Sequence, residues 1–140
     1  MGMVYTEITL TNEKDEVLAE DGYIPKSKVR SVTVKAVADT GSMYLVITEE
    51  LFEKLGLTVF DEHYANCANG QRVKCRRTST VNIRWKNRSI ALPALVIPGA
   101  QKVLFGALAL EGMDLMVNPV TQEVVGVHGE YEEHYALKAG

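Results

Sequence analysis

The sequence has few cysteines, little net charge and no long apolar run. Its two cysteines, Cys67 and Cys75, are too few for a disulfide scaffold and lack the neighbouring ligands of a zinc site. With no export signal visible at the N-terminus, we expect reduced thiols and a cytoplasmic protein. The net charge of −3 gives no reason to expect nucleic acid or an anionic membrane as a partner. No run of about 18 apolar residues occurs, so no transmembrane helix is expected.

The composition is that of an ordinary globular domain. Among 140 residues, 46% are hydrophobic and 24% are charged. We expect one domain over residues 1–140, with its core at about 30–120 and a loosely held tail at 129–140. His63, His128 and His134 show no ligand spacing, so neither a metal nor an organic cofactor is expected.

Short alternating segments dominate the chain and predict an all-β protein. Residues 4–11 place apolar and polar side chains on opposite sides, which is typical of a half-buried strand. Turn signals recur every 8–12 residues or so, a spacing that favours a closed or nearly closed β structure. Further strands are expected at 29–38, 44–47, 63–68, 71–77, 79–85, 90–97, 103–105, 115–117 and 123–127.

One short helix is predicted clearly, over residues 49–55. Thr48 is suited to cap its N-terminus, and Gly56 to end it through a left-handed conformation. Residues 107–111 are expected to form a single helical turn. The acidic stretch 12–22 is expected to be a solvated connection, with at most a short turn at 17–19.

Asn69 and Gly70 are a strong signal for a β-hairpin, because a type I′ turn needs positive φ at both central residues. In a two-residue turn, facing positions would sum to about 139. Cys67 would then lie nearer Arg72 than Cys75, which argues against a disulfide between the two cysteines. Their places beside the hairpin tip leave a redox switch open.

Four features follow one another in a fixed order. Asp39-Thr40-Gly41-Ser42 ends an apolar strand, and a short strand and helix come next. The hairpin tip Ala68-Asn69-Gly70-Gln71 is third, and the apolar segment Leu104-Phe105-Gly106 is fourth. In this order, over residues 30–120, the chain resembles the retropepsin-like aspartic protease family, in particular a small prokaryotic single-domain group. The resemblance implies an acid-protease fold, a closed β-barrel with a flap hairpin.

The resemblance also implies roles for individual residues. Asp39 would be the catalytic carboxylate, and the Thr40 hydroxyl would bond the partner's backbone across a dimer axis. Gly41 would permit close backbone approach, and Ser42 would complete the turn. The flap and substrate-binding residues would be Ala68, Asn69, Gly70 and Gln71, and Leu104, Phe105 and Gly106 would lie under the turn. Phe105 and Ala107 depart from the usual residues here, and the flap tip has one glycine where retroviral flaps have more.

The implied activity is that of an aspartic endopeptidase. Peptide hydrolysis by this route needs two carboxylates at one water, one acting as base and one as acid. The chain supplies a single Asp-Thr-Gly, so a homodimer would have to bring two copies of Asp39 together around a peptide or protein substrate. Residues 5–10 or 123–127 are the candidate interface strands, because exposed strand edges favour pairing.

Other interpretations stay open from the sequence. Asp39 would serve equally well as a turn-forming residue. The fold could also act as a catalytically silent dimeric module that binds a peptide or protein. The basic residues on the hairpin could form a solvated face or select acidic substrates; these are Arg72, Lys74, Arg76 and Arg77.

Overall fold

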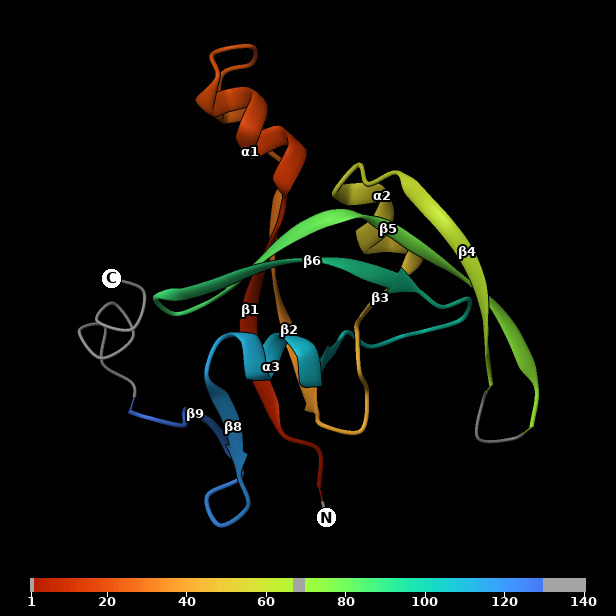
Figure 1. Cartoon of the computed structure of the whole chain (residues 1–140), viewed down its shortest axis with the longest axis vertical. Helices are drawn as coiled ribbons and strands as arrows, with labels where there is room; N and C mark the ends of the chain where they lie inside the picture. Colours follow the sequence, from red (N-terminus) through yellow and green to blue (C-terminus); the bar gives the residue numbers. More distant parts are fainter. Residues whose placement is uncertain (1, 67–69, 130–140) are drawn as a thin grey trace.

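One seven-stranded sheet forms the barrel and an added outer strand (Figure 1), in a computed structural model that describes residues 2–66 and 70–129. Six of the strands form a ring, because β1 pairs with β2 on one side and with β5 on the other. The predicted all-β closed barrel is therefore confirmed. The sheet order is β1 (Tyr5–Asn12), β2 (Ser31–Asp39), β7 (Leu104–Gly106), β3 (Leu45–Ile47), β6 (Arg88–Val96), β5 (Arg72–Trp85) and, outside the ring, β4 (Val59–Asn66).

The core fills the inside of this ring. Alternation along β1 buries Ile8 and Leu10 while their neighbours remain accessible, which is the expected period of a half-buried strand. Trp85 is almost fully buried, and its indole Nε1 donates to Thr6 Oγ1 at 2.8 Å, so its polar atom is paired. Other fully buried side chains come from every part of the ring and from the helices; they include Leu45, Ile47, Leu55, Val81, Ile83, Phe105, Leu110 and Met113.

Two helices lie where the sequence predicts them. The Thr48 hydroxyl accepts a hydrogen bond from Leu51 N at 3.2 Å and caps α2 (Glu49–Lys54), and Gly56 follows with φ +62°. The expected helical turn at 107–111 is α3 (Ala107–Gly112). No helix in the described part of the chain is long and apolar enough to cross a membrane.

The prediction of a solvated connection at 12–22 is wrong, because α1 (Glu13–Glu20) occupies it. Asn12 explains the helix: its Oδ1 accepts from Asp15 N at 3.2 Å and caps the first turn, where acidic side chains favour the helix dipole. The helix has too little apolar periodicity to be read from the sequence. A short 3₁₀ turn, η1 (Lys26–Lys28), then leads into β2.

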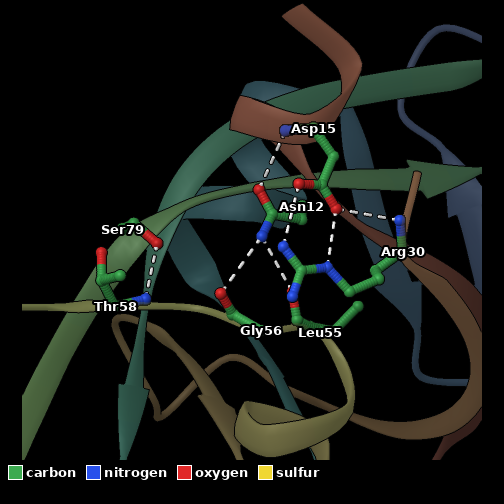
Figure 2. Close-up of polar contacts among 7 residues, drawn as sticks. All are labelled: Asn12, Asp15, Arg30, Leu55, Gly56, Thr58 and Ser79. Atoms are coloured by element: carbon green, nitrogen blue, oxygen red, sulfur yellow. Dashed lines mark hydrogen bonds and ion pairs between the residues drawn. The ribbon is translucent and has the colours of Figure 1, made fainter. Parts of the chain in front are cut away.

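A polar network around the buried Asn12 and Asp15 holds α1 to the barrel and to α2 (Figure 2). Asn12 Nδ2 donates to Leu55 O at 2.8 Å, at the end of α2. Asp15 accepts from Nε and Nη2 of Arg30 at 2.9 and 3.0 Å, and from Arg30 N at 3.0 Å. The hydrogen bonds from the Arg30 side chain lower the pKa of Asp15, against the opposing effect of burial. Residues from four segments are thereby fixed together.

The β4–β5 hairpin differs by one residue from its predicted register. His63 faces Cys75 and Asn66 faces Arg72, so facing positions sum to 138. This sum is one less than the value of about 139 that the sequence predicts. Gly70 has the expected positive φ of +84°. The predicted positions of Cys67, Ala68 and Asn69 lie outside the described residues, as does the tail after Gly129.

β5 continues well beyond the hairpin. The two strands expected at 71–77 and 79–85 are one strand, with a register irregularity between Arg77 and Thr80 where it meets β6. The first part of the strand pairs with β4 and the second with β1 and β6. The hairpin is therefore an extension of the barrel wall itself. β8 (Leu115–Asn118) and β9 (Glu123–Gly126) pair separately, as predicted.

Candidate active site

Asp39 is the last residue of β2, at the point where the strand leaves the barrel. It pairs in parallel with Gly106 of β7. Its Oδ1 accepts a hydrogen bond from Gly41 N at 2.9 Å, and its carbonyl accepts from Ser42 N at 3.1 Å. These two bonds close a tight turn on which Asp39 is half-buried and Thr40 is exposed. The carboxylate is thus held in place and accessible from one side.

The segment from Gly106 onward supports this turn. Ala107 N donates to Ser42 O at 2.7 Å, and Leu108 N donates to Met43 O at 3.1 Å. A Cβ on Gly106 would lie only 2.5 Å from the carbonyl oxygen of Ser42, so the two backbones approach as closely as a glycine allows. The structure brings together the predicted turn and Leu104-Phe105-Gly106, with Phe105 fully buried in the core.

An apolar pocket of about 520 Å³ opens beside Asp39 and Thr40. β2 and β7 supply Val37 and Leu104 to its wall, and the N-terminal segment and the β8–β9 hairpin complete it. One basic residue, Lys102, reaches the pocket from the loop before β7. The sequence did not predict this pocket, because residues that line it lie about 100 positions apart in the chain and share no motif. They include Met3, Val4, Val117 and Pro119.

Apolar side chains are exposed around the same turn. Met43 is 57% exposed and lies beside Leu108, whose backbone it bonds. Val120, in the β8–β9 turn, is 89% exposed. The N-terminal segment, the β2–β3 turn and the β8–β9 hairpin all lie at the lower end of the molecule in Figure 1. This end of the barrel presents an apolar surface next to Asp39, with Met3, Tyr44 and Met116 also exposed.

The predicted hairpin residues are only partly described. Gly70 and Gln71 are exposed at the end of the projecting hairpin, while Ala68 and Asn69 lie outside the described residues. The basic run is largely paired on the hairpin itself or with α2, which favours the solvated-face interpretation. Lys74 pairs with Glu62 at 3.4 Å, Arg76 with Glu49, and Arg77 with Asp61, while Arg72 stacks on Tyr64 at 4.6 Å.

Arg88 lies between the strands expected at 79–85 and 90–97, where the sequence assigns it no role. In the structure it opens β6 and is 1% exposed. Its Nη1 donates to the carbonyls of Met113 and Asp114 at 3.0 and 2.9 Å, and its Nη2 donates to that of Gly129. The guanidinium therefore joins β6 to the end of α3 and to both ends of the β8–β9 hairpin, which forms one wall of the pocket.

Comparison with known proteins gives one family match. The sequence model of a family described as "Aspartyl protease" matches residues 26–127, which include the Asp39 turn, the hairpin and the Gly106 segment. No curated protein sequence matches the chain. Among solved structures, the EIAV protease complexed with the inhibitor HBY-793 is 22% identical with a TM-score of 0.42, covering 53% of this chain and 70% of that chain.

Proposed function

Because this chain belongs to an aspartyl protease family, we propose that it is an aspartic endopeptidase whose active site is completed by a second copy of the chain. The observation that carries the proposal is the Asp39 turn. A carboxylate held by Gly41 N, on a turn fixed against Gly106, opens onto a pocket able to take a substrate side chain.

In this mechanism each protomer contributes one Asp39. The ionised carboxylate takes a proton from a water molecule, and the protonated one polarises the scissile carbonyl as that water attacks. Two carboxylates that contact the same water molecule share one proton, because ionising both would place two negative charges side by side. The exposed Thr40 hydroxyl is placed beside Asp39, where it could bond the partner's turn and fix the distance between the two carboxylates.

Exposed apolar side chains at this end of the barrel, outside the pocket beside Asp39, form the surface that we propose for the dimer. Exposed side chains such as Met43, Leu108 and Val120 would be covered there by the second copy. Of the two candidate interface strands, β9 pairs only with β8 among the described residues. β1 is already paired with β2 along its length and with β5 over Thr9–Asn12, which favours β9 as the edge that joins the protomers.

The β4–β5 hairpin would serve as the flap. An extended peptide lying between the hairpin and the Asp39 pair would place alternate side chains in pockets and its backbone along strand edges. The hairpin's continuity with the barrel wall through β5 would anchor its base while its end, at Gly70 and Gln71, covers the substrate. A cytoplasmic location stays a prediction from the sequence.

The test compares the wild type with Asp39→Asn on a broad peptide library, with and without a pepstatin-type inhibitor. We expect the variant to lose turnover by at least about 1,000-fold while its melting temperature and dimer fraction stay unchanged. Asp21→Asn is the matched control, because Asp21 is exposed at the end of α1 and forms no ion pair among the described residues. Equal turnover by wild type and Asp39→Asn would overturn the protease assignment. Peptide binding without turnover by the wild type would replace it with a silent binding module.

A further inference from the structure

Lys102 lies at the edge of the pocket beside Asp39, and within residues 2–66 and 70–129 it has no anion as a partner. Its Nζ lies 3.3 Å from the Tyr5 hydroxyl and 3.2 Å from Met3 Sδ, both of which are neutral. No carboxylate lies within ion-pairing distance of it in the described part of the chain. By contrast, most basic side chains around the hairpin and α2 pair with a carboxylate, as Lys54 does with Glu50 at 3.0 Å.

The backbone fixes Lys102 relative to Asp39. Val37 N donates to Val103 O at 2.8 Å, and Val37 faces Leu104 in the parallel pairing that ends with Asp39 opposite Gly106. Lys102 thus precedes Gly106 by four residues, which span at most about 14 Å of extended chain. The cation and the reacting carboxylate lie at different parts of one pocket.

The wall between these two charges is apolar. Val37 and Leu104 line it from neighbouring strands, and Val4 and Val117 from the N-terminal segment and β8. A purely apolar substrate side chain would pack against this wall but leave Lys102 with neutral neighbours only. A side chain with a methylene stem and a terminal carboxylate would satisfy both features, because the stem packs on the wall and the carboxylate reaches the ammonium.

We propose that this pocket selects a glutamate side chain of the substrate, held by Lys102 at its carboxylate and by Val37 and Leu104 along its stem. The inference rests on the proposed protease function, and it names the substrate class for that site. Lys102 is accordingly a specificity-determining residue that takes no part in the chemical step. Aspartate, with a shorter stem, would reach the ammonium less well.

The first test is cleavage of peptides that differ only by Glu, Gln, Leu or Lys at the residue entering the pocket. The wild type should show kcat/KM about fivefold higher for Glu than for Gln, as expected for an accessible ion pair, and the preference should shrink at high salt. Lys102→Met keeps the length of the stem and should abolish the preference, while Lys102→Glu should shift it to a Lys peptide. Lys54→Met is the control, because Lys54 lies in α2, pairs with Glu50 and does not line the pocket. It should change neither the rate nor the preference.

Binding separates failure of this inference from failure of the protease proposal. Fluorescence anisotropy with the Asp39→Asn variant should show the Glu peptide binding about fivefold tighter than the Gln peptide, and Lys102→Met should remove that difference. If binding discriminates but the wild type cleaves nothing, the pocket inference stands and the protease proposal fails. Equal cleavage and equal binding of Glu and Gln peptides would overturn the pocket inference alone. If Lys102→Met prevents dimerisation but leaves the peptide preference intact, the pocket binds the partner chain and not the substrate. That result would also overturn the pocket inference.

Discussion

Replacing Gly106 by Ala would push the Asp39 turn off its support. The new Cβ would lie 2.5 Å from the carbonyl oxygens of Ser42 and Tyr44 and 3.0 Å from the carbonyl carbon of Met43. All three are backbone atoms, so no change of rotamer can relieve the contact. Gly106 itself has φ −90° and ψ −177°, which any residue adopts. The glycine is therefore required by space and not by backbone conformation.

The displacement follows from these distances. Ordinary van der Waals contact begins at 3.4 Å, so the turn must move by 3.4 − 2.5 = 0.9 Å. Such overpacking costs about 1–3 kcal/mol, which lowers the melting temperature by roughly 3–10 °C for a chain of this size. A shift of about 1 Å in a catalytic group costs on the order of 100-fold in rate. The loss of activity should therefore exceed what the loss of stability explains.

Thermal unfolding and kcat/KM measured on the same preparation check both magnitudes. Gly22→Ala is the matched control, because Gly22 has φ +80° with nothing within 4 Å of an added Cβ. It should lower stability by about 1 kcal/mol through backbone strain alone and keep full activity. A Gly106→Ala protein that melts within about 1 °C of the wild type and keeps its kcat would refute the close contact between Gly106 and the turn.

Two further predictions concern the buried polar groups. Asp15→Asn should lower the free energy of unfolding by about 2 kcal/mol at pH 7, because charge-assisted hydrogen bonds to Arg30 are lost. Hydrogen bonds from Arg30 lower the folded-state pKa of Asp15. The wild type's advantage in free energy of unfolding over Asp15→Asn is therefore full well above the ordinary pKa of 3.8 and fades as the pH falls below it. Urea titrations of both proteins at pH 7 and pH 3 measure this difference, and a difference independent of pH would contradict the prediction. Arg88→Met should cost about 3 kcal/mol by leaving the carbonyls of Met113 and Gly129 without the Arg88 donor, while the Asp114 carbonyl keeps the hydrogen bond from Val127 N. Hydrogen exchange should then speed up in β8 and β9 first, and uniform loss of protection across the barrel would argue against a local clamp.

Local signals carried the parts of the fold that the sequence predicts. Strand alternation locates β1 and β2, and the Thr48 cap with Gly56 delimits α2, because these patterns depend on residues close together in the chain. α1 was missed because its support comes from Arg30, fifteen residues after Asp15. The described pairs of the β4–β5 hairpin are one residue away from the register that a two-residue turn at Asn69-Gly70 predicts.

The residues of the candidate site also fall into two groups: those that local motifs predict and those that only the folded chain brings together. Asp39, Gly41 and Gly106 were predicted as site residues from motifs, and the structure brings them into one turn and its support. The pocket could not be predicted, because Lys102 and Val117 meet there only after the barrel closes. The burial of Arg88 could not be predicted either, because charge normally indicates exposure. Its burial depends on three carbonyls that come from the far end of the chain.

The measurement that tests the account most directly is subunit mixing. Wild-type chains are combined with a tenfold excess of Asp39→Asn chains under conditions that allow subunits to exchange, and turnover is measured per wild-type chain. If two copies of Asp39 make one active site, nearly all wild-type chains pair with the variant, and turnover falls by about tenfold. Turnover per wild-type chain that is unchanged by the excess would show that one Asp39 suffices, and it would contradict the shared active site.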